Sequence, residues 1–186
     1  MIPLGYMLKD VASPAPDWVN APSVSAVHSL ARCASADFGD YIPLWRHNGW
    51  WLFNSPTAVA AAAIELGIKP ETMSLFYYES WENEFDDEAL YWRPIKPEAS
   101  FQTEVVLPSV SATLSGYDVI TFTTGTSPEC SPLSCSGRAD ELSVNALCLF
   151  DTFEQAKASV ERGDFNDFEP GPYRIIAVYS LRGLTE

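Results

Sequence analysis

Two similar segments, each running into a predicted helix, restrict how this chain can fold. One is WWLFNS at residues 50–55, and the other is LCLFDT at residues 147–152. Aligning the sequence with itself at an offset of 97 residues also matches Cys33 with Cys130, Asn48 with Asn145, Leu52 with Leu149 and Phe53 with Phe150. Similarity at a fixed spacing is the signature of a repeated structural unit. We therefore expect an internal pseudo-repeat in which each half follows the order strand, loop, strand, helix, strand.

Runs of β-branched and aromatic residues between turn-forming residues predict the strands of this unit. These runs span residues 2–11, 49–54, 72–82, 89–95, 101–108, 117–124, 145–150 and 172–181. The polar segment NEFDDE separates the third run from the fourth, which indicates a β-hairpin.

Capping residues predict the two helices. Ser55 followed by Pro56 is typical of an N-cap with proline at the first helical position, and Gly67 is expected to end that helix. We expect Asp151 to cap the second helix, with Glu154 completing a capping box.

These elements predict an α+β fold with a mainly antiparallel sheet and two main helices. We expect a single compact domain over residues 1–186. Pro94 and Pro97 mark the expected boundary between two related halves, residues 1–97 and 98–186.

The acidic composition excludes some classes of partner. The chain has 25 acidic and 11 basic residues, and its formal net charge is −14. Because the basic residues are scattered singly, this charge repels nucleic-acid phosphates and anionic membranes, and neither is expected as a partner. Solubility or a basic protein partner suits such a charge.

Whether the cysteines form disulfides depends on the compartment in which the protein resides. The N-terminal segment MIPLGYMLKD does not resemble a secretory signal, and no apolar run approaches the roughly 18–20 residues that a membrane helix needs. We therefore expect a cytoplasmic, reducing setting. In that setting the cysteines are expected to be free thiols, namely Cys33, Cys130, Cys135 and Cys148.

A zinc site is the alternative for part of this set. The segment HSLARC places His28 ahead of Cys33, and CSPLSC places Cys130 ahead of Cys135. If the loops bearing them meet, these side chains supply the nitrogen and sulfur ligands of a tetrahedral zinc ion. Zinc knuckles usually have two residues between their ligands, however, and each pair here has four. We therefore expect no metal and no cofactor.

Catalytic signatures are absent from the sequence. A cysteine nucleophile needs a nearby base, and the chain offers only His28 and His47. No glycine-rich phosphate loop, HExxH pattern or G-x-S-x-G nucleophile elbow occurs. The sequence thus favours a non-catalytic protein.

The stretch from Phe76 to Trp92 combines six acids with seven aromatic residues. Acidic groups beside exposed rings capture cationic side chains by ion pairing and cation–π contact. We expect a docking surface for a basic protein, formed by Tyr78, Glu79, Trp81, Glu82, Glu84, Asp86, Asp87 and Trp50. The competing interpretation is an amphipathic hairpin whose rings enter the core while its acids are solvated.

Two functional classes follow from these observations. The first is a non-catalytic acidic interaction protein that binds a basic protein partner, as an inhibitor or an immunity protein does. The alternative is a small thiol- or zinc-dependent enzyme or metal protein that uses the Cys130/Cys135 loop together with Cys33 and a histidine.

Overall fold

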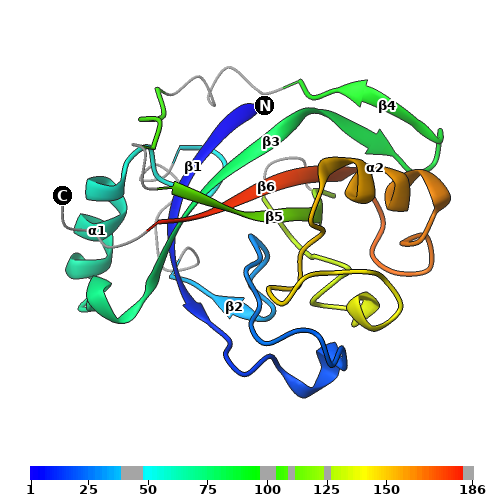
Figure 1. Ribbon diagram of the computed structural model, residues 1–186. Helices are drawn as coiled ribbons and strands as arrows, with labels where there is room; N and C mark the ends of the chain where they lie inside the picture. Colours follow the sequence, from blue (N-terminus) through cyan, green and yellow to red (C-terminus); the bar gives the residue numbers. More distant parts are fainter. Residues whose placement is uncertain (39–47, 97–103, 109–111, 124–126, 182–186) are drawn as a thin grey trace.

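A computed structural model describes residues 1–38, 48–96, 104–108, 112–123 and 127–181 of the chain. It confirms an α+β fold: an antiparallel six-stranded sheet is accompanied by two α-helices (Figure 1). The strand order is β2-β1-β3-β6-β5, and β4 pairs with β3 outside this path. Within the described residues, no helix is long and apolar enough to cross a membrane.

The sheet combines strands from both ends of the sequence. Its strands are β1 (Ile2–Val11), β2 (Ser35–Ala36), β3 (Ser74–Asp86), β4 (Tyr91–Pro94), β5 (Ala112–Thr121) and β6 (Tyr173–Leu181). The helices are α1 (Pro56–Glu65) and α2 (Phe153–Arg162), with single 3-10 turns η1 (Asp17–Val19), η4 (Pro70–Thr72) and η6 (Arg138–Asp140). The predicted run 2–11 has the same bounds as β1. The runs 72–82, 89–95, 117–124 and 172–181 correspond to β3, β4, β5 and β6, with shifted ends.

The sheet is covered on both faces. Tyr77 and Tyr78 are neighbours on β3, so their side chains point to opposite faces, and they are only 1% and 0% exposed. Tyr77 packs beside Tyr6 of β1 and Tyr179 of β6. Aromatic residues on both faces of this strand therefore reflect a two-sided core.

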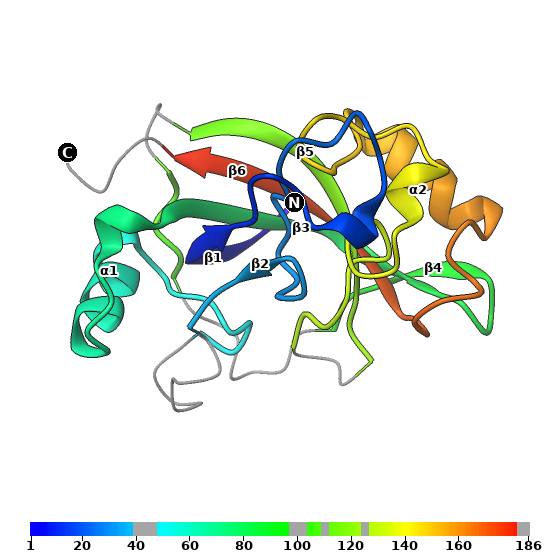
Figure 2. The same cartoon turned by 90° about the horizontal axis from the view of Figure 1, so that it is seen from below.

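The helices and the loops occupy different parts of the sheet. Helix α1 contacts β1, whereas α2 contacts β5 and β6, and the two helices lie at opposite ends of the molecule (Figures 1 and 2).

The loop after β1 and the loop after β5 lie side by side. Their contact includes hydrogen bonds from Ser25 N to Ala146 O (2.9 Å) and from His28 N to Leu147 O (3.0 Å).

The segments 49–54 and 145–150 are turns, so the prediction of strands there was wrong. Trp51 and Cys148 have left-handed backbones, with φ of 60° and 63°, which no strand accommodates. Each turn follows an asparagine whose backbone N–H donates to the carbonyl four residues later. These bonds run from Asn48 to Leu52 (2.9 Å) and from Asn145 to Leu149 (2.8 Å).

Each turn docks against a strand at one bridged residue pair, Tyr6 with Phe53 and Tyr117 with Phe150. The asparagine side chain fixes this contact: Asn48 Nδ2 donates to Leu4 O (2.6 Å) and Asn145 Nδ2 donates to Ser115 O (2.9 Å). Glycine is required where the turn and the strand meet. A Cβ on Gly5 would lie 2.5 Å from Phe53 O, and a Cβ on Gly116 would lie 2.6 Å from Phe150 O.

The helix caps were predicted in part. Ser55 caps α1 as predicted, with its side chain accepting from Ala58 N, and Pro56 is the first helical residue. The predicted cap of α2 was wrong by one position. Thr152 is the N-cap, and Gln155 completes the capping box, because it is the Thr152 side chain that accepts from the Gln155 N–H.

The strand predicted at residues 101–108 was also wrong where it can be checked. Residues 104–108 have no regular structure, and residues 101–103 lie outside the described part. Val106 instead links two elements: its carbonyl accepts from the Tyr6 hydroxyl (2.6 Å), and its N–H donates to Asn54 O (2.9 Å). These bonds connect the segment to β1 and to the residue before the N-cap of α1.

Gly116→Ala should destabilise the protein far more than Gly67→Ala. Both glycines have positive φ (143° and 74°), but a Cβ at Gly67 meets nothing within 4 Å, whereas one at Gly116 meets Phe150 O. We expect a loss of about 3 kcal/mol for Gly116→Ala and about 1 kcal/mol for Gly67→Ala, measured by urea unfolding. Equal losses would contradict the described contact between strand and turn.

Candidate functional site

Three cysteines from two distant loops form a cluster. The sulfur atoms of Cys33, Cys130 and Cys135 all lie within 4.8 Å of one another. Cys33 and Cys135 are joined as a disulfide across a sequence separation of 102 residues, with their Cα atoms 5.6 Å apart. Cys33 is exposed and Cys130 is buried, so the cluster extends from the surface into the interior.

The prediction of free thiols was therefore wrong for Cys33 and Cys135. The two loops converge over the sheet at a Cα separation typical of disulfides, which the sequence alone did not reveal. Cys130 and Cys148 are free, as predicted, and both are buried. Burial raises the pKa of both thiols to about 12, so both are protonated at neutral pH.

A tight turn brings Cys130 and Cys135 together. Within CSPLSC, the N–H groups of Ser134 and Cys135 both donate to Ser131 O, at 3.1 and 2.7 Å. Cys130 is fixed to the end of β5, because its N–H donates to the Thr121 side chain (3.1 Å) and its carbonyl accepts from Thr121 N (2.9 Å). The turn thus starts from a rigid strand.

A buried lysine holds the Cys33 loop. The Lys9 ammonium on β1 is fully buried and donates to the carbonyl oxygens of Leu30 (2.7 Å), Ala31 (3.2 Å) and Ser35 (3.1 Å). It also pairs with the Asp37 carboxylate at 3.1 Å. Burial lowers the Lys9 pKa, and Asp37 opposes that shift. These bonds define the path of the loop on both sides of Cys33.

Asp118 connects the two loops beneath the cysteine cluster. This fully buried carboxylate on β5 accepts 2.6 Å hydrogen bonds from Ser29 in the first loop and Ser131 in the second. It also accepts from Val119 N (2.9 Å). Burial raises the pKa of Asp118 to about 6, although these donors and Lys9 partly oppose the shift.

The structure brings together three of the four zinc candidates. His28 is not part of the cluster. Its ring packs edge-on against Phe76 of β3 with centroids 4.9 Å apart, and burial lowers its pKa. His47, the other candidate base, lies outside the described residues.

The residues predicted to form a docking surface are dispersed. Trp50, Tyr78 and Glu84 are buried, and Glu79 is half-buried between the hydroxyl groups of Tyr77 and Tyr179. Trp81, Asp86 and Asp87 are also half-buried, and Glu82 is exposed. Most of this set therefore belongs to the core or its edge.

Arginines neutralise two of the hairpin acids. Glu84 accepts from Arg174 of β6 (2.8 Å) and from Arg93 of β4 (3.0 Å). Arg93 also pairs with Asp86. Asp87 is occupied differently, because its side chain accepts from Gly171 N (2.8 Å) and so ties the hairpin to the loop before β6.

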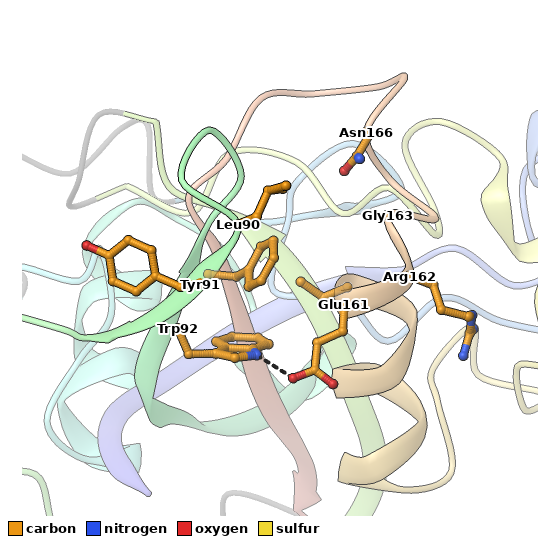
Figure 3. A pocket seen from close by; sticks show the side chains of 9 residues that line it. Leu90, Tyr91, Trp92, Glu161, Arg162, Gly163 and Asn166 are labelled. Carbon is orange, nitrogen blue, oxygen red and sulfur yellow. Dashed lines mark hydrogen bonds between the residues drawn. The ribbon is translucent and has the colours of Figure 1, made fainter.

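A pocket with a volume of about 340 Å³ lies between the hairpin and α2 (Figure 3). Trp92 is held in its wall by a hydrogen bond from its indole N–H to Glu161 (2.9 Å). Leu90 and Tyr91 line the pocket and remain 66% and 51% exposed. Arg162 and Asn166 lie on the opposite side (Figure 3).

We define the tip surface as this pocket with the exposed side chains of Glu88, Leu90, Tyr91 and Asp167. The residues predicted to form the docking surface include Asp86 and Asp87 at the end of the same hairpin, but they omit Leu90 and Tyr91, the exposed side chains that line the pocket. Strand alternation could not identify these two side chains, because Leu90 lies in the turn after β3 and Tyr91 is the first residue of β4. The left-handed φ of 57° at Leu90 marks the turn that leaves this side chain outside.

Comparison of the chain with protein-family models, curated proteins and solved structures finds no match. Its function must therefore be argued from the site.

The raised pKa of Asp118 predicts a pH-dependent stability. The Asp118 pKa is about 6 in the folded state, against 3.8 for an ordinary aspartate, so the folded state holds this proton more tightly than the unfolded state does. The resulting stabilisation is complete below about pH 4 and is lost as the pH rises through 6, amounting to roughly 3 kcal/mol.

Asp118→Asn tests this assignment, because the amide is neutral at every pH and Ser29 can rotate to accept from it. We expect the variant to gain roughly 3 kcal/mol relative to the wild type between pH 4 and pH 7, measured by urea unfolding at each pH. A constant difference across that range would show that Asp118 does not titrate there.

Proposed function

We propose that this chain is a non-catalytic acidic protein that binds a basic protein partner, as an inhibitor or an immunity protein does. The tip surface is the proposed docking site. This moves the docking site from the predicted residues, most of which are buried or half-buried, to the exposed side chains that follow them in the turn of the hairpin. A cytoplasmic setting remains part of the proposal.

The observation that carries the proposal is the exposure of Leu90 and Tyr91 beside a pocket. Large apolar side chains at 66% and 51% exposure, next to a concave site with an indole in its wall, have the composition of a protein-binding hot spot. Trp92 is fixed by Glu161, and its ring meets Phe85 and Trp81 at centroid distances of 5.1 and 4.7 Å. The surface is therefore preorganised, which reduces the entropic cost of binding.

Charge supports a basic partner. The net charge of −14 attracts cationic proteins over long range. At the tip itself, Glu88 and Asp167 are exposed, whereas Arg162 is already paired with Asp164. A lysine or arginine from the partner would place its alkyl chain against Leu90 and its charge near the acids and the Tyr91 ring.

We also propose that residues 1–97 and 98–186 are two related halves. Several observations support this. The N-caps Ser55 and Thr152 match at the offset of 97 residues, and the buried helix residues Val59, Ala62 and Ala63 match Ala156, Ser159 and Val160 at the same offset. The asparagine turns and their glycine contacts also correspond. The tip surface combines the hairpin of the first half with α2 of the second half, so binding would require both.

Changes at the tip surface should abolish partner binding without unfolding the protein. Leu90→Asn keeps a residue that tolerates left-handed φ, and Tyr91→Thr keeps β-propensity. We expect the double variant to bind a partner, captured from the source cells and identified by mass spectrometry, more than tenfold more weakly. The control is Ile64→Ser with Leu66→Ser, two exposed apolar residues at α1, which should bind as the wild type does.

The contribution of the acidic residues at the tip surface to partner binding can be tested separately. Glu88→Lys with Asp167→Lys should slow association and flatten its salt dependence, measured by surface plasmon resonance at several salt concentrations. The matched control is Glu71→Lys with Glu104→Lys, two exposed acids outside the tip surface. If the tip and control variants retain the partner equally, or if the captured proteins are acidic, the proposed function is wrong.

A further inference from the structure

We propose that Cys33, Cys130 and Cys135 form a three-thiolate site for Zn²⁺ when the Cys33–Cys135 disulfide is reduced. This goes beyond the proposed function, since partner binding at the tip surface does not require it. The disulfide and the metal site would be two states of the same sulfur atoms.

The spacing of the sulfurs fits such an ion. Zinc binds thiolate sulfur at about 2.3 Å in a tetrahedron, which separates any two sulfurs by about 3.8 Å. All three sulfurs already lie within 4.8 Å of one another. Breaking the disulfide lets its two sulfurs move apart, and an adjustment of about 1 Å by Cys130 completes the triangle.

A structural disulfide does not explain why a third sulfur, that of Cys130, lies beside it. Cys33 and Cys135 alone would link the two loops, yet Cys130 is buried against both of them. Cys148 is the natural comparison within the chain. It is also buried and free but is not part of the cluster, as expected for a cysteine that only fills space.

The loops that carry the sulfurs are fixed independently of the disulfide. Lys9 holds the carbonyls on both sides of Cys33, Thr121 holds Cys130, and Ser131 O closes the turn at Cys135. Reduction should therefore leave the three sulfurs close together. A site that is preorganised in this way binds metal without first paying the entropy of assembling its ligands.

The surroundings favour a cation and leave one coordination position open. Glu129, Glu169 and Asp118 attract a cation; burial and these same charges raise the pKa of the Cys130 thiol, so that Zn²⁺ has to displace its proton. Ser136 also hydrogen-bonds the Cys130 side chain. Because Cys33 is exposed, the fourth ligand can be water, as in zinc sites that keep an open position.

The reaction balances with a dithiol reductant. The dithiol gives two electrons and two protons to the disulfide, which yields the thiols of Cys33 and Cys135 while the reductant becomes a disulfide. Binding of Zn²⁺ then releases one proton from each of the three cysteines. The product is a zinc–thiolate group of net charge −1 with water in the fourth position.

Cobalt(II) titration of the full-length protein, reduced and kept under anaerobic conditions, tests the site. Thiolate-to-cobalt charge-transfer absorption counts the sulfur ligands, and visible bands report tetrahedral geometry. We expect the wild type and Cys148→Ser to bind one Co²⁺ per chain with three-thiolate intensity, and Zn²⁺ to displace it. Cys130→Ser should lose roughly one third of that intensity and bind more than tenfold more weakly.

Oxidised wild-type protein provides a second measurement that does not depend on a variant folding. With two sulfurs engaged in the disulfide, it should show no charge-transfer band, and Zn²⁺ should raise the unfolding midpoint of the reduced protein only. Absence of Co²⁺ binding by the reduced wild type would overturn the proposal in favour of a disulfide alone. A Cys130→Ser spectrum equal to that of the wild type would overturn it as well.

Discussion

The burial of the Lys9 ammonium is the constraint on which the arrangement of the loops after β1 and β5 depends. A fully buried charge is tolerated only when its donors are satisfied, and here three loop carbonyls and the Asp37 carboxylate satisfy them. Removing one partner of such a buried pair typically costs about 3–5 kcal/mol, so the first loop is bound to β1 along its path. Asp118 then joins this loop to the second through Ser29 and Ser131. The cysteines meet because these two buried groups leave both loops little freedom.

Elements with a strong local pattern could be predicted from the sequence. The long runs of β1, β3 and β6 and the Ser55–Pro56 cap follow from propensity and capping chemistry. The segments ending in Phe53 and Phe150 could not be assigned correctly. Their apolar residues suit a strand, but the asparagine side chains bond to the strand carbonyls at Leu4 and Ser115 and fold each segment into a turn. Such a side-chain contact over a long sequence distance has no local signal.

The sequence predicted which segments carry the candidate sites, but not which residues within them come together. The sequence predicted His28, Cys33, Cys130 and Cys135 as possible ligands. The structure brings the three cysteines together and places His28 against Phe76. Which histidine or cysteine joins a cluster depends on how two loops cross, and no spacing rule describes that. Likewise, the acid-rich hairpin stood out by composition. The arginines that neutralise Glu84 come from β4 and β6, so only the sheet register shows that this acid is unavailable and that the hairpin end is exposed.

Loops that are 102 residues apart in sequence converge on one group of sulfurs. Peptide mapping of the oxidised, alkylated protein by tandem mass spectrometry tests this convergence. We expect a cross-linked peptide in which Cys33 is bonded to Cys135, with Cys130 and Cys148 recovered in alkylated form. If Cys33 were linked to neither Cys130 nor Cys135, the described convergence of the two loops would be wrong.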